Sequence, residues 1–587
     1  MALTKATYSM IDGATAFVDD FGAVPDNATD CTSAIQNAVD SNLIVKFGNG
    51  TYYCAGTITL PDGAKLVGGE STTIRARWVT PASGGGYSNR LFTSTGVGNS
   101  ITLENLTIDG SRAGYDASTD SENCIKIRDA SYVEFKNVTI TKVASNYGGS
   151  DFSNVSIRNC DRVVLDGLSM IDNKVEGFHV IGESSSGSST VVEVTNFYAN
   201  TDNYTSLTVF YADRCLIRNA NVYQTGNGSR FNLLATELYV SDCYVSGNAP
   251  TSANGFGIEN EAGSKLWPQK IQQFNNITFD DCLIGISCEP RWQYQEIIEN
   301  LIITNISCIN MSTCVQVGYV DRAEIANVVG DCATVVVAQV SSTTTPATGA
   351  VSRGPNNISI SDVNADCARG ILNLFSHDAS GVTWQIEAIN ISDSIFSANR
   401  PMTATTDYIA NAGATIKDFS MSNCRIIDSK TDTVTNPVNI PRVTELFSME
   451  NIYMADWEYN WTIDTTSADI ILDTVLANYL TVSKPTGPLT FTTASGKVSV
   501  QNCMIMGSTG ALLVQFNSST NTSFNISSNS PARLVSGLDQ TAVPTTGTWQ
   551  QGDIIWNTSP SAGGVIGWSC VTGGTPGTWK SFGTIAT

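Results

Sequence analysis

Two glutamates that stand two residues apart are the first residues in this chain whose spacing suggests catalysis. Glu259 and Glu261 lie in a short alternating segment that also holds Phe256 and Ile258. Side chains two residues apart on a β-strand point to the same side, with Cα atoms about 7 Å apart. If the two apolar residues face a core, then both carboxylates face outward, and Gly257 with them.

A second segment, 284–289, adds a third glutamate. If the two segments are neighbouring strands of a parallel sheet, alignment of their isoleucines gives three pairs: Ile258 with Ile286, Glu259 with Ser287, and Glu261 with Glu289. Such strands lie about 4.8 Å apart, so three carboxylates would crowd one patch, and like charges this close raise at least one carboxylate pKa. We predict Glu261 and Glu289 as the acid/base pair of a glycoside hydrolase, with Glu259 as the alternate.

Aromatic and basic residues follow both segments, in what we predict to be loops that leave the strands. Aromatic rings stack on sugar rings, and Arg or Lys can hold an acidic sugar. Two polar residues of preceding strands would lie on the same wall. The predicted substrate-binding residues are Lys265, Trp267, Arg291, Trp292, Tyr294, His179 and Asn232. Three further acids that can point outward are alternates for catalysis: Asp213, Glu176 and Glu183.

The same residues leave other chemistry open. A polysaccharide lyase would use a base such as Tyr294 or His179, and a cation such as Lys265 or Arg291 to neutralise a uronate carboxylate. An isolated outward glutamate is usually a solvated surface residue, so a wall that only binds also remains open. A serine hydrolase is disfavoured, because no Gly-x-Ser-x-Gly elbow precedes a helix. Nothing in these residue types requires a metal or another cofactor.

Composition excludes several classes of partner. The 587 residues include 54 acidic and 32 basic side chains, and the net charge of −22 argues against nucleic acid. The chain has no apolar run of about 18 residues, so we expect no membrane insertion. The two histidines leave little room for a histidine-built zinc site. The first residues lack the apolar core of a signal peptide, so export by that route is not expected.

The 15 cysteines do not form the spacing of a disulfide framework or a zinc knuckle. Several follow Asn or Asp directly after an alternating strand, as Cys160, Cys243, Cys282, Cys424 and Cys503 do. We interpret them as small buried apolar residues at an equivalent place in successive repeats.

Short alternating segments separated by Asn, Asp and Gly recur every 20 to 40 residues or so, which favours a solenoid. Helical patterns are almost absent, so we predict an all-β, right-handed parallel β-helix in which each coil pairs with its neighbours. The alternatives are a large β-sandwich or a propeller. One helix is expected at 31–40, capped by Asp30 or Thr29, where it would cover the open end of the solenoid.

An ordered series of short motifs follows the start of the chain, at residues 20–23, 30, 34–38, 50–52, 60–63 and 66–68. The series resembles the N-terminal cap of pectate-lyase-like right-handed β-helices, especially bacteriophage tailspikes. Near the end, Gly-Asp-Ile-Ile-Trp-Asn (552–557) and Gly-Thr-Pro-Gly-Thr-Trp-Lys (574–580) resemble a small module that ends many tailspikes and tail fibres. This module would act in trimerisation or folding, or bind sugar.

The resemblance divides the chain into a short anchor or linker (1–15), a cap (16–90), a β-helix body with a substrate groove (91–435), a further β-rich region of solenoid or trimerisation type (436–545) and a C-terminal β module (546–587). It implies a homotrimeric spike on the virion tail, made in the host cytoplasm and joined to other tail proteins through its N-terminus. The implied activity is endoglycosidic cleavage of O-antigen or capsule; a lyase or a non-catalytic adhesin is the alternative.

Overall fold

The computed structural model describes residues 15–41, 44–76, 91–94, 96, 98–110, 124–143, 153–182, 190–224, 228–247, 255–260, 269–288, 297–318, 320–340, 355–366, 370–376, 384–398, 414–428, 438–440, 442–455, 461–464, 468–478, 489–492, 498–501, 503–505, 514–516, 524–527, 539–545, 549 and 551–587. The chain divides into two units, with residues 1–402 and 411–414 in the first and residues 403–410 and 415–587 in the second.

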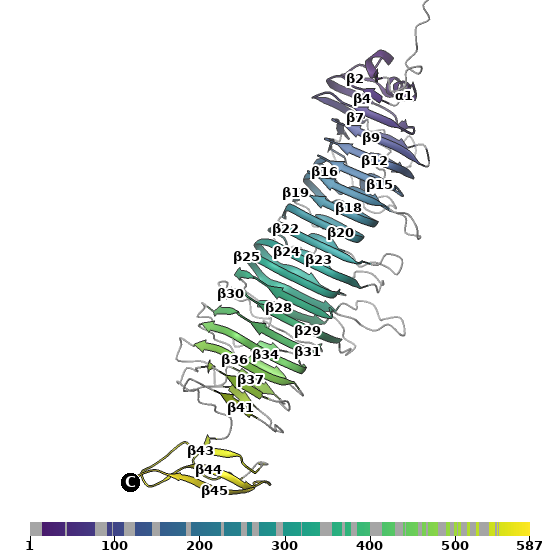
Figure 1. Ribbon diagram of the computed structural model, residues 1–587. Coiled ribbons are helices and arrows are strands. Elements are labelled where there is room, and N and C mark those ends of the chain that lie inside the picture. The colour runs from purple at the N-terminus through teal and green to yellow at the C-terminus, as the bar shows by residue number, and fades with distance from the viewer. Residues whose placement is uncertain are drawn as a thin grey trace, which may run out of the picture. The chain divides into compact units, whose positions relative to one another are not determined.

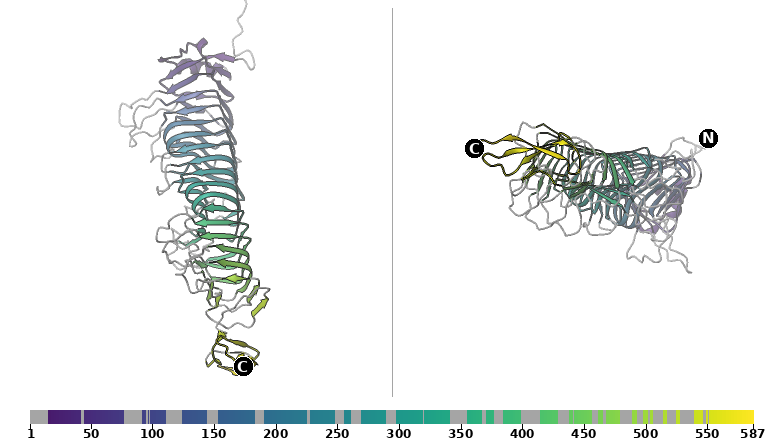
Figure 2. Two further views of the ribbon diagram at one scale, coloured as in Figure 1. Left: turned by 90° about the vertical axis from the view of Figure 1, so that its left-hand side faces the viewer. Right: turned by 90° about the horizontal axis from the view of Figure 1, so that it is seen from below.

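The first unit is a right-handed parallel β-helix, which confirms the predicted fold (Figure 1). Its strands form three stacks, called walls A, B and C here, and each coil of the chain visits them in that order. Figure 2 shows the successive coils of this unit stacked one on another.

Wall A consists of β5 (Ile58–Leu60), β8 (Phe92–Ser94), β11 (Ile125–Arg128), β14 (Ser153–Arg158), β21 (Phe256–Asn260), β23 (Ile284–Cys288), β28 (Gly370–Ser376) and parts of β16 (Ser169–Ile181), β18 (Tyr198–Arg218), β20 (Phe231–Ser246), β24 (Ile298–Val317) and β25 (Val320–Val340).

Wall B consists of β1 (Thr15–Phe17), β3 (Ile44–Lys46), β6 (Ala64–Val67), β9 (Asn99–Glu104), β12 (Ala130–Lys136), β15 (Arg162–Asp166), β17 (Val191–Thr195), β26 (Asn357–Ser361), β29 (Trp384–Ser392) and parts of β18, β20, β22 (Ile271–Asp280), β24 and β25.

Wall C consists of β2 (Asp26–Asp30), β4 (Gly50–Cys54), β7 (Thr72–Ala76), β10 (Thr107–Asp109), β13 (Thr139–Thr141), β19 (Asn221–Gln224), β27 (Asn364–Asp366), β30 (Ile395–Ala398) and parts of β16, β18, β20, β22, β24 and β25.

Asparagine and aspartate make the turn between walls B and C. Their short side chains tolerate the left-handed backbone that this turn needs. The residues with positive φ at this turn are Asn105, Asn137, Asn196, Asn219, Asp242, Asn276, Asn305, Asn327, Asp362 and Asp393. Their amides also bond along the stack, as when Asn219 Nδ2 donates to Asn196 Oδ1 over 2.7 Å. The turn residues seen in the sequence therefore close each coil and join it to the next.

The predicted helix covers the first coils. Helix α1 (Thr32–Ser41) buries Ile35, Ala38 and Val39, and a short 3₁₀ helix, η2 (Val18–Phe21), precedes it. Asp30 supplies the predicted cap, since its Oδ1 accepts bonds from the backbone N (3.0 Å) and the hydroxyl (2.6 Å) of Thr32. No helix among the described residues is long and apolar enough to cross a membrane.

The 14 cysteines in the described part of the chain are buried, as predicted, but their positions are not equivalent. Cys160, Cys243 and Cys282 each follow a residue of positive φ. The first lies at the turn from wall A to wall B, the second at the turn from B to C, and the third at the turn from C to A. The prediction of one equivalent place in successive repeats is therefore wrong. What the positions share is local: the residue after a left-handed turn faces the core, and other coils place Leu106, Phe197 and Ile277 there.

The second unit is also β-rich. One set of its strands pairs in parallel: β31 (Ala414–Ser422), β32 (Arg425–Asp428), β34 (Arg442–Ala455), β36 (Asp469–Asn478), β38 (Val498–Gln501), β39 (Met504–Ile505) and β41 (Phe524–Ser527). A second parallel set comprises β33 (Val438–Ile440), β35 (Trp461–Asp464), β37 (Leu489–Thr492) and β40 (Val514–Phe516).

The chain ends in a small, largely antiparallel sheet of β42 (Asp539–Gln540), β43 (Ile554–Asn557), β44 (Val565–Thr572) and β45 (Thr578–Thr584). Ile555, Trp568, Cys570 and Trp579 form its small core.

Candidate functional site

The outward side chains of wall A form one polar column along the solenoid. Parallel pairing without a shift stacks equivalent residues of successive coils about 4.8 Å apart. The pairing places in line Thr59, Thr93, Lys126, Ser156, His179, Thr208, Asn232, Glu259, Ser287 and Gln316. The predicted pairs of Ile258 with Ile286 and of Glu259 with Ser287 are confirmed. His179 and Asn232 also share a wall with Glu259, as predicted.

This column is largely buried, unlike the outward rows of walls B and C. Glu259 is only 4% exposed, and His179, Thr208, Ser287 and Gln316 are buried as well. An outward glutamate on a plain solenoid wall would be solvated. A buried polar row costs free energy unless its groups find partners. Packing of the core does not call for such a row, so wall A is the wall on which we look for function.

Glu259 is held by the coil before it. The Ser229 hydroxyl donates a hydrogen bond to Oε2 of Glu259, although the two residues are 30 positions apart. Ser229 is itself buried and lies two residues before the start of β20. The bond restricts the orientation of the Glu259 side chain.

The fully buried Arg230 fixes the backbone around this contact. Its Nη1 donates to the carbonyl oxygens of Gly228 (2.9 Å) and Phe256 (3.4 Å), and its backbone N donates to the carbonyl of Phe256 over 3.1 Å. Burial lowers the pKa of this guanidinium. Arg230 thus ties the residue before Ser229 to the strand that carries Glu259.

The alternation predicted that Gly257 faces outward with Glu259, but the structure shows that it faces inward. A Cβ at this position would lie 2.6 Å from the ring of Phe279, a buried core residue. Glycine is therefore required where β21 passes this ring. The pairing keeps one register on both sides of Gly257, with Phe256 beside Ile284 and Ile258 beside Ile286.

A second polar layer closes the end of β21. Asn260 is fully buried, and its Oδ1 accepts a bond from Gln269 Nε2 over 3.1 Å. Its Nδ2 lies 3.8 Å from the Sγ of Cys288 at the end of the next strand. This layer holds in place the point at which the chain leaves wall A toward residue 261.

Most of the other predicted site residues lie outside the described part of the chain. The residues that lie outside the described part are Glu261, Glu289, Glu183, Lys265, Trp267, Arg291, Trp292 and Tyr294. Glu176 lies in β16, where its backbone pairs with Ser153 and Thr205. Asp213 is not in the column, whose member on this strand is Thr208. It lies at the turn toward wall B, where burial raises the pKa of its carboxyl.

The sequence prediction missed Ser229, Arg230, Thr208 and Gln316. Alignment of every coil on its inward residues would have found Thr208 and Gln316. A buried arginine has no sequence signal, because arginine at the start of a strand is normally exposed.

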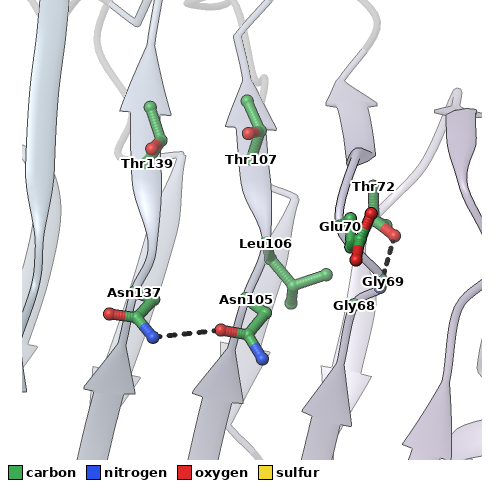
Figure 3. Close-up of a pocket in the computed structure, with 9 residues that line it drawn as sticks. All are labelled: Gly68, Gly69, Glu70, Thr72, Asn105, Leu106, Thr107, Asn137 and Thr139. Carbon is green, nitrogen blue, oxygen red and sulfur yellow. Dashed lines mark hydrogen bonds between the residues drawn. The ribbon is translucent and has the colours of Figure 1, made fainter.

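A groove of about 540 Å³ lies away from wall A, along the turn between walls B and C in the first coils (Figure 3). The residues that line it are Gly68, Gly69, Glu70, Thr72, Asn105, Leu106, Thr107, Asn137 and Thr139. Figure 3 shows the amides of Asn105 and Asn137 side by side, and Asn137 Nδ2 donates to Asn105 Oδ1 over 3.1 Å. With one carboxylate and no aromatic ring in this lining, the groove offers no acid/base pair.

No group of three or more His, Cys, Asp or Glu side chains in the described part of the chain is placed to hold a metal ion.

Residues 17–141 match the family described as rhamnogalacturonase A/epimerase, pectate lyase-like. No curated protein matches the chain. Among solved structures, PfbA, a surface adhesin of Streptococcus pneumoniae, is 12% identical over 98% of this chain and 100% of that chain, with a TM-score of 0.25. The exopolygalacturonase of Thermotoga maritima is 11% identical over 76% and 92%, with a TM-score of 0.28.

The N-terminal fragment of gene product 12 of bacteriophage Phi29 is 12% identical over 87% of this chain and 92% of that chain, with a TM-score of 0.28. The chain is therefore similar in sequence to pectate lyase-like proteins over its cap and first coils.

Proposed function

We propose that this protein is a phage tailspike that binds and cleaves bacterial surface polysaccharide, O-antigen or capsule, along wall A. The observation that carries the proposal is the position of Glu259: a buried carboxylate, bonded by Ser229, in the middle of a polar column. An extended polymer laid along the solenoid axis meets one coil after another. The less buried members of the column, Thr59, Thr93, Lys126 and Asn232, can form hydrogen bonds to such a polymer.

The chemistry is endoglycosidic hydrolysis by two carboxyl groups. One carboxylic acid protonates the glycosidic oxygen as the bond from that oxygen to the anomeric carbon breaks. A carboxylate takes a proton from the water that adds to the anomeric carbon, or attacks that carbon itself. We assign Glu259 to the carboxylate role, because Ser229 holds its side chain in one orientation, and Glu261 or Glu289 to the acid.

The phage role is supported by sequence. The cap motifs lie inside the region that matches the pectate lyase-like family, and the C-terminal motifs resemble the ends of tailspikes. The proposal includes a homotrimer on the virion tail, made in the host cytoplasm and joined to other tail proteins through residues 1–15. Pull-down of those tail proteins, lost on deletion of residues 1–14, tests the attachment; unchanged binding would refute it.

A second candidate is a polysaccharide lyase. His179 and Lys126 lie on the same column as Glu259. An imidazole can take the proton next to a uronate carboxylate, and an ammonium group can neutralise that carboxylate. A polysaccharide that lacks uronic acid would exclude this chemistry.

The test is incubation of the full chain with purified surface polysaccharides from a panel of Gram-negative strains, followed by mass spectrometry. Oligosaccharides of regular repeat that have each gained one water support the hydrolase. Products without the added water that absorb in the near ultraviolet show a lyase. Binding without fragments shows an adhesin, and either of these results overturns the hydrolase.

A further inference from the structure

Wall C carries a long face that is almost without charge. From β13 to β25, the outward residues of this wall form two columns. We call these columns the neutral face. The first holds Thr139, Ser169, Tyr198, Asn221, Tyr244, Thr278, Ser307 and Val329. The second holds Thr141, Ile171, Asn200, Tyr223, Ser246, Asp280 and Ile309. Asp280 alone among them is charged, and its Oδ2 accepts a 2.6 Å bond from the Tyr244 hydroxyl.

The neighbouring wall B, in contrast, carries many charged outward residues. Its outward residues form ion pairs across the coils, such as Lys65–Glu104 at 3.0 Å, Arg162–Glu193 at 2.9 Å and Arg214–Glu237 at 3.4 Å. Charged rows of this kind are normal for a wall that faces water. The chain has a net charge of −22, so a wall with one charged outward residue over eight strands is unusual for a water-facing surface.

Charged residues also mark both ends of the neutral face. On the side of the first coils, Arg75 and Asp109 form an ion pair on β7 and β10 at 2.8 Å. On the other side, Asp331 of β25 pairs in the sheet with Asp366 of β27. The eight strands between these limits span roughly 34 Å at about 4.8 Å per strand.

Large apolar side chains stand exposed within these limits. Ile309 is 47% exposed, and Ile171, Tyr198, Tyr223 and Val329 are exposed as well. Single exposed apolar residues are common, but a continuous apolar patch on a soluble protein usually marks a site of interaction. Five exposed apolar residues on one nearly uncharged face make this face a candidate interaction site.

The tyrosines indicate what kind of partner covers it. The rings of Tyr198 and Tyr223 lie 6.0 Å apart, and those of Tyr223 and Tyr244 lie 5.4 Å apart, with interplanar angles of 50° and 42°. Each ring thus packs partly on the next along the wall. A partner meets ring edges and hydroxyls between isoleucines, which suits an interdigitating protein surface better than a sugar ring that stacks on an open aromatic face.

We infer that the neutral face of wall C is the surface through which copies of this chain associate. Two identical chains of charge −22 repel each other wherever charged walls meet, and this repulsion is smallest where both surfaces lack charge. Association here buries the exposed isoleucines and tyrosines and does not involve wall A. The inference rests on the homotrimer of the proposed function, for which it names the contact surface, and not on the chemistry proposed for wall A.

Strand β24 supplies a matched pair of substitutions. Ile309 and Ile302 both point outward from this strand, Ile309 on wall C and Ile302 on wall B. Each stands beside an acid of an adjacent coil, Asp280 for Ile309 and Glu324 for Ile302. Ile309→Lys and Ile302→Lys therefore introduce the same charge next to the same kind of neighbour, but on different walls.

The experiment measures the molar mass of the full chain by size-exclusion chromatography with light scattering over a wide range of protein concentration. We expect wild type and Ile302→Lys to be multimers with the same midpoint of dissociation. Ile309→Lys should dissociate at a concentration about tenfold higher or more, because a lysine must be buried in the contact. Circular dichroism confirms that both variants fold; if Ile309→Lys does not fold, Tyr223→Ser replaces it.

Oxidative labelling of tyrosine gives an independent readout. Tyr198 and Tyr223 should be labelled less in the wild-type multimer than in dissociated protein. A wild-type chain that is monomeric at every concentration overturns the inference. So does a multimer in which Ile309→Lys behaves like Ile302→Lys and Tyr223 is labelled as in the monomer. Protection of Tyr223 by polysaccharide in a monomeric chain would show a sugar-binding face instead.

Discussion

The Ser229 hydroxyl donates a hydrogen bond to Oε2 of Glu259, from one coil of the β-helix to the next. The contact exists because β20 and β21 pair in register, with Asn232 beside Glu259. Arg230 bonds to backbone carbonyls on both sides of the contact. A carboxylate held in this way has little freedom to rotate, which is what a base or a nucleophile needs.

Replacement of Glu259 by Gln should abolish cleavage and keep binding. The amide has nearly the same shape but cannot take a proton or attack, so we expect the rate of oligosaccharide release to fall by about 10²- to 10⁴-fold. Binding of the polysaccharide, measured by fluorescence or calorimetry, should stay within a few-fold of wild type. The control is Glu237→Gln, which removes an acid from the ion pair with Arg214 on wall B and should leave release unchanged. Release from Glu259→Gln at the wild-type rate would remove Glu259 from the mechanism.

The asparagine turn should contribute to stability through both its backbone conformation and its side-chain bonds. Asn305 has φ of 58°, and its Nδ2 donates to Asn275 Oδ1 over 2.6 Å. Asn305→Ala should lower the free energy of unfolding by about 2–3 kcal/mol, from left-handed strain and lost bonds. Asn305→Gly keeps the backbone freedom and should cost about 1 kcal/mol less. Urea unfolding followed by circular dichroism measures both. Equal losses would show that the backbone conformation is not what selects asparagine here.

The ion pair between Arg75 and Asp109 should stabilise the first coils far more than a surface pair does. Asp109 is 4% exposed, and Arg75 Nε donates to its Oδ2 over 2.9 Å, while Nη1 donates to Asn27 Oδ1 over 2.7 Å. Arg75→Ala leaves a buried carboxylate without its cation, at a cost of about 2–3 kcal/mol. The double variant with Asp109→Ala should recover part of this loss.

The comparison for this pair is Arg162→Ala on wall B, where both partners of the Arg162–Glu193 pair are at least one third exposed. This change should cost less than about 1 kcal/mol. Thermal unfolding of the variants measures the difference. If Arg75→Ala and Arg162→Ala lose the same free energy of unfolding, then burial of Asp109 does not strengthen its ion pair.

The buried thiols should make the protein sensitive to alkali. Burial raises the pKa of Cys124, Cys160, Cys215 and Cys243 from an ordinary value of 9.0 to about 12. Above pH 9, therefore, the unfolded chain has lost these protons while the folded chain keeps them. The unfolded state then binds fewer protons, so the free energy of unfolding falls as pH rises, by about 1.4 kcal/mol per pH unit for each thiol.

Removal of one thiol tests this directly. In Cys215→Ala, the free energy of unfolding should fall less steeply between pH 9 and pH 12 than in wild type, by about 1.4 kcal/mol per pH unit. Below pH 8 the two proteins should show the same dependence on pH. Urea midpoints at a series of pH values give the slopes. Identical slopes in the alkaline range would mean that Cys215 ionises in the folded protein.

The sequence determined the architecture because a β-helix is specified locally. Alternation of apolar and polar residues sets which side of each strand faces the core, and Asn or Asp at the turns permits the left-handed backbone seen at Asn105 and Asn305. It even set the register at the candidate site, since alignment of Ile258 with Ile286 follows from matching inward residues in neighbouring coils. The helix at the start follows from its own spacing and from the cap at Asp30.

Only the tertiary structure decided the environment of the site. Burial of Glu259, its bond from Ser229 and the inward turn of Gly257 all depend on what adjacent coils place beside them. The neutral face of wall C likewise appears only when residues 22 to 34 positions apart are stacked by pairing. A sequence shows which side of its own strand a residue occupies. Which neighbours surround it depends on the register of every coil on either side, and that is a property of the folded stack.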